Sequence, residues 1–194
     1  MVPDHKELQK QIAVLTPGGQ ILFALLCAER LRASCWAFSK RENWDITSYY
    51  EGCDFLFEQV VQNTTIDQTQ VESFVDDLDK CVPQSDEFGD PLAVQAQSGL
   101  IALLHAFDSV KTADSEAGVN AAGAVEEGVD NYQYFVNKEM TGQLTSPTEY
   151  PLLDREIKWQ LESIATLRQF TRPEREKYVS LRILNRTYAV PIAV

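Results

Sequence analysis

The sequence has few of the residues on which most catalytic and metal sites depend. Its 194 residues include only two histidines, His5 and His105, and four cysteines without any C-x-x-C pair. A Ser–His–Asp triad needs a histidine beside its nucleophile, and zinc or dithiol sites need closely spaced cysteines. H-E-x-x-H, Walker and G-x-G-x-x-G motifs are also missing. The sequence therefore predicts no cofactor, and it favours a non-catalytic protein over an enzyme.

Positive charge and long apolar runs are scarce as well. The chain has 17 lysines and arginines against 29 acidic residues, which gives a formal net charge of -12. Such a chain repels the phosphates of nucleic acids and anionic membranes, and it attracts basic proteins. The longest apolar run, residues 21–28, is far shorter than the roughly 20 residues of a membrane span, and no secretory leader opens the chain. We expect a soluble cytoplasmic protein that binds neither nucleic acid nor membranes, with a basic protein as its partner.

What the chain does contain is ordinary globular composition, with 44% hydrophobic residues. A chain of this length buries most of its apolar surface in one core without help from disulfides. We therefore expect a single domain over residues 1–194, with residues 1–6 and 188–194 as flexible ends. The widely spaced cysteines lie on apolar helix faces and are expected to be buried, reduced side chains.

Apolar residues recur at the three- and four-residue spacing of amphipathic helices along the whole sequence. Strand-like alternation with hairpin turns is missing, so the sequence predicts an all-α bundle of seven or eight helices. The expected helices are a short start at residues 8–15 and longer segments near 20–40, 46–60, 67–82, 91–110, 114–140, 151–164 and 171–184, with 84–89 as a polar linker. Residues typical of helix caps stand at Thr16, Asp45, Asp67, Asp90 and Thr171.

Two segments have an unusual composition. Residues 117–128 are rich in glycine and alanine, which predicts close helix packing and a surface on which a second copy of the chain can pack. Charge is also uneven, because residues 42–156 hold 23 acidic and 4 basic side chains, whereas residues 168–186 hold 6 basic and 2 acidic ones. The last helix is therefore expected to dock electrostatically on the acidic body.

Paired carboxylates are the one candidate for a metal site. Asp54 and Glu58 are four residues apart on one expected helix, and Glu127 and Asp130 are three apart on another. This arrangement resembles that of all-α nucleotide pyrophosphatases, which hold magnesium with an E-x-x-E on one helix and an E-x-x-D on another. The four-residue spacing of Asp54 and Glu58 differs from the E-x-x-E spacing. Magnesium prefers such hard oxygen ligands. The alternative interpretation is that the four carboxylates are solvated surface charges.

Glu29 and Arg30 place two adjacent charges in the most apolar expected helix. Buried ions are stable only when they are paired and hydrogen-bonded. One interpretation is a structural ion pair with a neighbouring helix, in which Asp54 or Glu58 pairs with Arg30. The other is that Glu29 and Arg30 form part of a polar pocket for a small molecule.

The same helix carries a family resemblance. Residues 23–31 read FALLCAERL, which matches the F-x-x-x-[LC]-x-E-R-[ML] segment of the YjaG-like family of bacterial proteins. Asp54 and Glu58 fall in that family's D-x-x-W-E segment, with Phe57 in place of the tryptophan, and Glu156-x-x-x-Gln160 agrees more weakly. The resemblance implies an all-α fold and a bacterial cytoplasmic setting, but the family is a domain of unknown function, so no activity follows.

Three hypotheses of function remain from the sequence. The first is a non-catalytic interaction or binding protein, of which an immunity-type inhibitor of a basic nuclease toxin is a specific form, because an acidic surface steers a basic partner. The second is a magnesium-dependent, nucleotide pyrophosphatase-like enzyme that uses the four paired carboxylates. The third is a small-molecule pocket at Glu29 and Arg30.

Overall fold

The computed structural model of the chain describes residues 5–112, 114–141, 151–170 and 175–187. These residues form ten helices and no strands, so the expected all-α fold is confirmed. The helices are α1 (His5–Ala13), α2 (Pro17–Arg30), α3 (Arg32–Glu42), α4 (Thr47–Gln62), α5 (Gln68–Cys81), α6 (Ser85–Phe88), α7 (Pro91–Thr112), α8 (Ser115–Thr141), α9 (Pro151–Leu167) and α10 (Arg175–Thr187).

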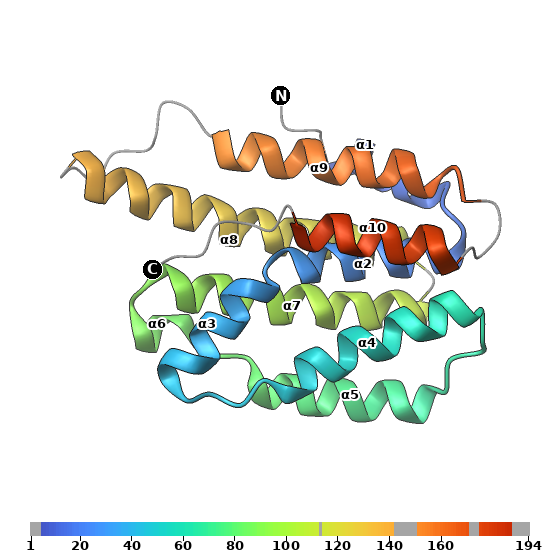
Figure 1. Cartoon of the computed structure of the whole chain (residues 1–194), viewed down its shortest axis with the longest axis horizontal. Helices are drawn as coiled ribbons and strands as arrows, with labels where there is room; N and C mark the ends of the chain where they lie inside the picture. The colour runs from blue at the N-terminus through green and yellow to red at the C-terminus, as the bar shows by residue number, and fades with distance from the viewer. Residues whose placement is uncertain (1–4, 113, 142–150, 171–174, 188–194) are drawn as a thin grey trace.

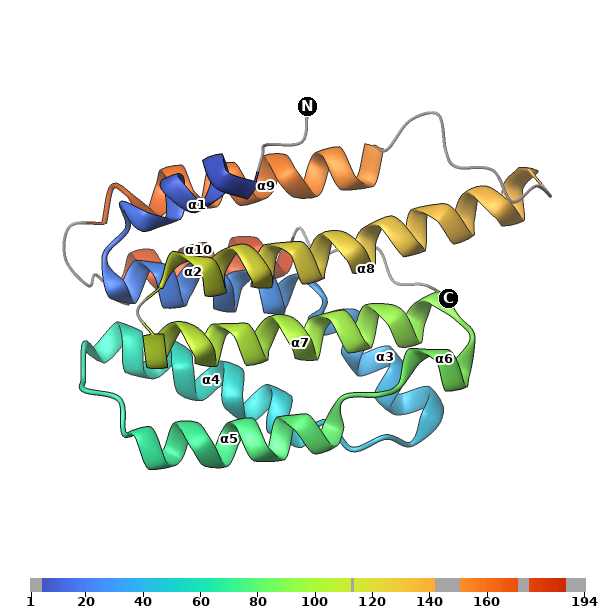
Figure 2. The same cartoon turned by 180° about the vertical axis from the view of Figure 1, so that it is seen from behind.

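The helices pack around α2. Helices α7 and α8 form an antiparallel pair against it, α1 and α9 lie along one edge of the molecule, and α4 and α5 lie along the opposite edge (Figures 1 and 2). Helix α10 contacts α2 and α4 from the outside. None of the helices in the described part of the chain combines the length and the apolar character that a membrane crossing requires.

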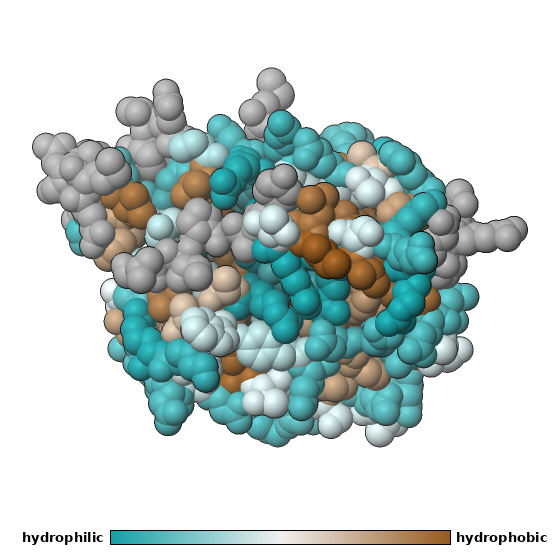
Figure 3. Space-filling model, in the orientation of Figure 1, coloured by the Kyte–Doolittle hydropathy of each residue, from teal (hydrophilic) through white to brown (hydrophobic). Residues whose placement is uncertain are grey.

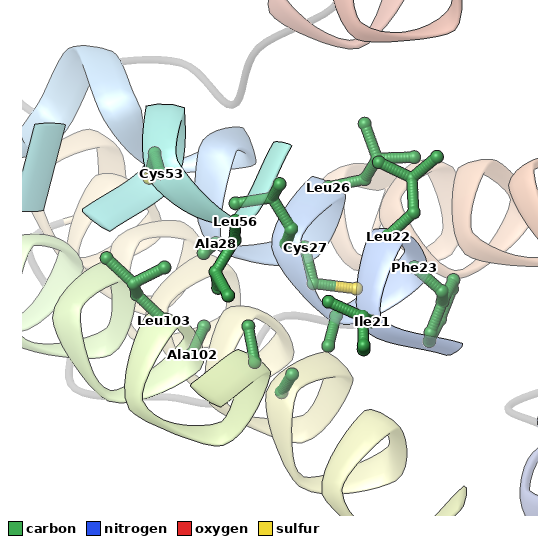
Figure 4. Packing of buried hydrophobic residues seen from close by; sticks show 14 of the residues in the cluster. Ile21, Leu22, Phe23, Leu26, Cys27, Ala28, Cys53, Leu56, Ala102 and Leu103 are labelled. Carbon is green, nitrogen blue, oxygen red and sulfur yellow. The ribbon is translucent and has the colours of Figure 1, made fainter. Parts of the chain in front are cut away.

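Helix α2 is buried on all sides, as its composition predicts. Every residue from Gly19 to Arg30 is buried, and Leu22, Leu25 and Leu26 have no exposed surface. Figure 4 shows α2 side chains packed among Cys53 and Leu56 of α4 and Ala102 and Leu103 of α7. A helix that is apolar all round gains stability only in the centre of a core, which is where α2 lies.

Most of the predicted helix starts are confirmed. The Thr16 hydroxyl accepts a hydrogen bond from the Gly19 N–H (3.1 Å), and the Asp67 and Asp90 carboxylates cap α5 and α7 in the same way. Asp45 lies one residue before the actual cap position of α4, although its carboxylate accepts a bond from the Thr47 N–H (2.9 Å). The predicted cap at Thr171 lies outside the described residues.

The number of helices differs from the prediction at two places, the break at Leu31 and the turn α6. The expected helix at residues 20–40 is broken at Leu31, which has φ -99° and ψ 8°, so that Leu31 and Cys35 lie against Gly99 of α7. The linker at 84–89 also contains a helical turn, α6, which ends at Gly89 with φ +63°. The described chain therefore has nine helices of at least nine residues and one of four, rather than seven or eight.

The cysteines and the chain ends can be compared with their predictions. All four cysteines are free, and Cys27, Cys35 and Cys53 are buried, as expected. Burial raises the pKa of the Cys35 thiol to about 12, so it stays protonated at neutral pH. The predicted flexible ends fall outside the described residues, except for residues 5 and 6, which begin α1.

The small residues of α8 allow close packing within the chain. A Cβ atom on Gly118 would meet Ile12 Cγ2 at 3.2 Å, and one on Gly128 would meet Ser98 Cβ at 3.0 Å. The predicted close helix contact is therefore confirmed at these two positions. Because α1 and α7 already occupy this surface, the structure gives no support to pairing of two copies through residues 117–128.

Substitution of glycine by alanine should change the stability of the protein differently at tightly packed and at open positions. In Gly99→Ala the new Cβ would lie 2.7 Å from Cys35 Sγ and 3.1 Å from Leu31 Cβ. Overpacking of this kind costs about 1–3 kcal/mol, which outweighs the roughly 1 kcal/mol gained in helix propensity. We expect urea unfolding to show a net loss of up to about 2 kcal/mol.

Gly123→Ala is the matched control, since its Cβ would meet only His5 Cε1 at 3.9 Å. This variant should gain up to about 1 kcal/mol of stability. Equal gains for the two variants would show that α7 and α3 do not pack as closely as described.

Candidate functional site

Glu29 and Arg30 are the natural starting point for a site, because both charges are buried. Their residues are 0% and 1% exposed. Neighbouring residues on a helix are rotated by about 100°, so the two side chains point to different neighbours. Glu29 forms its ion pairs with α10, whereas Arg30 forms its ion pair with α9 and also donates from Nη1 to the Asn185 carbonyl of α10 (3.4 Å). The structure thus separates the two predicted pocket residues into two charge clusters.

The first cluster surrounds the Glu29 carboxylate with arginines. Arg182 donates to Oε1 through Nε (2.9 Å) and Nη2 (2.6 Å), and Arg186 donates to the same oxygen through Nη2 (2.5 Å). Arg32 Nη1 lies 3.5 Å from Oε1. Asp54 Oδ1 accepts a further bond from Arg182 Nη2 (2.6 Å). We call these five residues, Glu29, Arg32, Asp54, Arg182 and Arg186, the Glu29 cluster.

The Glu29 cluster attaches α10 to the bundle. Burial acts to lower the pKa of the Arg182 guanidinium, but its bonds to Glu29 and Asp54 raise that pKa above the ordinary value. The guanidinium also lies over the Phe57 ring of α4, at 4.3 Å from the ring centroid. At the exposed start of α10, Arg175 forms two bonds of 2.9 Å with Glu58. The predicted electrostatic docking of the last helix is confirmed.

The second cluster joins Arg30 to α9. Arg30 Nε donates to Glu156 Oε2 at 2.8 Å, and its Nη2 lies 2.8 Å from the same oxygen. The guanidinium stacks over the Trp159 ring at 4.6 Å. The expected ion pair for Arg30 is present, but Glu156 is the partner in place of Asp54 or Glu58, since Arg30 faces α9 and not α4.

A groove of about 440 Å³ runs between α9 and α10, with Arg30 at its base. We call it the α9–α10 groove. Its lining residues are Arg30, Arg155, Lys158, Trp159, Glu162, Ser163, Thr166, Leu181 and Leu184. Figure 3 shows an apolar patch bordered by hydrophilic side chains over the position of α10, whose Ile183 and Leu184 are 60% and 49% exposed.

The two residues of the candidate polar pocket differ in their relation to the groove. Arg30 lines the groove, but Glu29 is absent from the described lining because it is fully packed and ion-paired with α10. Trp159, Lys158 and Leu184, which form much of the groove, had no distinctive sequence signal. Glu156 stood out only through the family resemblance.

The predicted magnesium ligands are not assembled into a site. Asp54 and Glu58 of α4 are paired with arginines of α10, while Glu127 and Asp130 are exposed on α8. Helix α4 packs on α2, α5, α7 and α10, whereas α8 packs on α1, α2, α7 and α9. No group of three or more histidine, cysteine or acidic side chains able to hold a metal ion occurs in the described ranges. In the described residues Asp54 and Glu58 are thus ion-paired with arginines, and Glu127 and Asp130 are surface charges.

The pKa of one further carboxylate, that of Glu126, is shifted. Burial raises the pKa of Glu126 on α8 above its ordinary value of 4.5, and the charge of Glu156 raises it further. Glu156 Oε1 is itself buried without a hydrogen-bond partner. At the boundary between α8 and α9, the charge of Glu156 therefore disfavours the charged form of Glu126.

Comparison with known proteins gives a family and a fold. Residues 7–190 match the family described as "Protein of unknown function (DUF416)". The crystal structure of a DUF416 family protein from Shewanella baltica OS155 is similar with a TM-score of 0.77 and 15% sequence identity, over 95% of this chain and 97% of that chain. At this identity the likeness concerns the fold alone. Comparison with curated proteins gives no match.

Removal of the Glu29 charge should lower the free energy of unfolding far more than removal of an exposed charge on α4. Glu29→Gln leaves Arg182 and Arg186 beside a buried amide, and loss of one partner of a buried ion pair costs about 3–5 kcal/mol. The control is Glu58→Gln, which breaks the exposed pair with Arg175 and should cost about 0–1 kcal/mol. Urea unfolding measures both. Similar losses in the two variants would contradict the anchoring by Glu29.

Glu126→Gln should stabilise the protein in a pH-dependent way. Because the folded-state pKa of Glu126 is raised, the folded protein keeps this proton where the unfolded chain has lost it. Stability is therefore lost as pH rises past the ordinary glutamate value, and the uncharged variant avoids that loss. We expect Glu126→Gln to melt at a higher temperature than the unchanged protein at pH 7 and at the same temperature near pH 3. The exposed control, Glu127→Gln, should melt like the unchanged protein at both pH values. A pH-independent gain would show that charge is not the cause.

Proposed function

We propose that this chain, which belongs to the DUF416 family of proteins of unknown function, is a non-catalytic binding protein whose ligand site is the α9–α10 groove. The observation that carries the proposal is the Arg30 guanidinium at the base of a hollow of about 440 Å³. Small-molecule sites are typically hollows of about 300–1,000 Å³ with apolar walls and a few fixed polar groups. The groove has each of these properties.

The polar group at the base of the groove is held in one orientation. Glu156 pairs with Arg30 through two contacts of 2.8 Å, and the Trp159 ring supports the face of the guanidinium. Both charged side chains are 1% exposed. A group fixed in this way loses little entropy when a ligand binds, which favours affinity.

The walls of the groove are also fixed. Helix α9 packs on α2 and α8, while the Glu29 cluster holds α10 against α2 and α4. Leu181 and Leu184 lie in the groove wall, and Arg182 and Arg186 anchor the same helix to Glu29. The groove is therefore preformed rather than assembled by its ligand.

The lining favours binding over catalysis. Ser163 and Thr166 supply hydroxyl groups, but the described lining contains no histidine that would activate a hydroxyl as a nucleophile. A magnesium-dependent, pyrophosphatase-like activity lacks support, because Asp54 and Glu58 are paired with arginines. This leaves recognition as the function that the groove serves.

Other expectations about the chain stay predictions. An immunity-type inhibitor of a basic nuclease toxin would use the acidic outer face of α5, where Glu72, Asp76, Asp77 and Asp79 are exposed. The narrower YjaG-like assignment, the bacterial origin and the cytoplasmic location are likewise predictions from the sequence.

A fragment screen with three native tryptophans as reporters tests the proposal. Trp159 lines the groove, whereas Trp36 is 55% exposed on α3, so their indole N–H signals in ¹H–¹⁵N spectra distinguish groove binding from surface binding. A library of neutral, anionic and cationic fragments should contain compounds that shift the Trp159 signal and leave Trp36 unchanged.

A matched pair of variants locates the binding site. Thr166→Phe places a ring in the groove and should weaken these fragments by about tenfold or more, since a filled hollow cannot hold them. Thr69→Phe, at an exposed position of α5, should bind them normally. If no fragment moves Trp159, or if both variants bind equally, the groove is not a ligand site.

A further inference from the structure

We infer that the ligand of the α9–α10 groove is an organic anion that carries an acidic head group on an apolar body. This inference rests on the proposed function, because it concerns the same groove. It names the class of ligand, which the groove volume alone does not.

The first argument is a local reversal of charge. The whole chain has a formal charge of -12, yet the charged side chains of the described groove lining, apart from the neutralised Arg30, are the cations Arg155 and Lys158 and the single anion Glu162. The anionic side chain, Glu162, lies 3.8 Å from Lys158, and both are exposed. The net negative charge of the protein repels anions at long range. A locally positive surface can still bind an anion through direct contacts.

The second argument identifies which cations are available to a head group. Glu156 already neutralises Arg30, so that guanidinium fixes the base of the groove without adding net charge. Arg155 is exposed and takes part in no ion pair formed by the described residues. Within the described ranges, the one ion pair of Lys158 is its 3.8 Å contact with Glu162. Arg155 and Lys158 are therefore the residues that can attract an acidic group.

The third argument concerns the apolar body. Trp159, Leu181 and Leu184 form the apolar part of the lining, and Leu184 is 49% exposed. Covering this surface removes it from water, which contributes about 25 cal/mol for each Å². A purely polar ion such as inorganic phosphate would leave this surface uncovered.

The positions along α9 give the ligand a direction. The lining extends from Arg155 to Thr166, a rise of about 16 Å along the helix. Both available cations lie in the first half of this stretch, and the hydroxyl groups of Ser163 and Thr166 lie in the second. The acidic head group therefore binds at the end of the groove that holds Arg155 and Lys158.

The direct test compares octyl compounds with different head groups on the full chain. Octanoate, octyl phosphate and octylammonium are titrated while the Trp159 indole signal is followed. We expect either anion to bind about tenfold or more tightly than octylammonium, because the cation meets Arg155 and Lys158 with like charge. Whichever anion is stronger identifies the head group as carboxylate or phosphate, and both results support the inference.

The apolar part is tested by chain length. Hexanoate, octanoate and decanoate should increase in affinity by about three- to fourfold for each added methylene group, as expected when that group is buried. An affinity that does not depend on chain length would overturn the claim of an apolar body.

Variants test the head-group position. Arg155→Gln and Lys158→Gln should each weaken octanoate by up to about fivefold, as expected for exposed charge pairs. Lys111→Gln, at the exposed end of α7, is the control and should bind octanoate normally. Equal weakening in all three variants would indicate a general charge effect and contradict binding at Arg155 and Lys158.

The outcomes separate the two claims. If fragments bind at Trp159 but octylammonium binds as tightly as octanoate, the inference of an anionic ligand is wrong while the binding function stands. If neither the octyl compounds nor any fragment shifts the Trp159 signal, both claims are wrong.

Discussion

A carboxylate with no exposed surface must be neutralised where it lies, and Glu29 is neutralised by arginines from the far end of the chain. This requirement places α10 on the outside of α2, since Arg182 and Arg186 reach Glu29 only from there. The opposite face of α10 then presents Leu181 and Leu184 to α9. The α9–α10 groove is thus a consequence of the charge buried beneath α10.

Adjacent residues of α2 serve two different purposes. Glu29 fixes a helix, whereas Arg30, on the next position, presents a supported guanidinium at the base of the groove. The two charges do not neutralise each other, because Glu29 takes its charged partners from α10 and Arg30 takes its charged partner from α9. One buried segment thereby stabilises the fold and contributes to the candidate site, although the protein as a whole is strongly acidic.

The sequence predicted the local structure of the helices well, but it did not predict which distant residues form ion pairs. The caps at Thr16, Asp67 and Asp90 depend on residues a few positions apart, and they were predictable. The break at Leu31 has no proline or glycine, and it follows from packing on α7. Glu29 and Arg30 were recognisable as unusual, but their partners lie 153 and 126 residues away, and a single sequence holds no record of such pairs. Carboxylates at helical spacing are equally compatible with metal binding and with arginine pairing, so the sequence alone did not show that Asp54 and Glu58 pair with arginines of α10.

The long separation between Glu29 and its arginines also bears on how the protein is made. Synthesis proceeds from the N-terminus, so α2 and the helices that surround it leave the ribosome well before α10. Until then Glu29 has only Arg32 nearby as a positive charge, and the burial of its carboxylate is not compensated. The ion pairs of Glu29 with Arg182 and Arg186 can therefore form only after α10 has been synthesised, although the segments that bury this carboxylate come earlier in the chain.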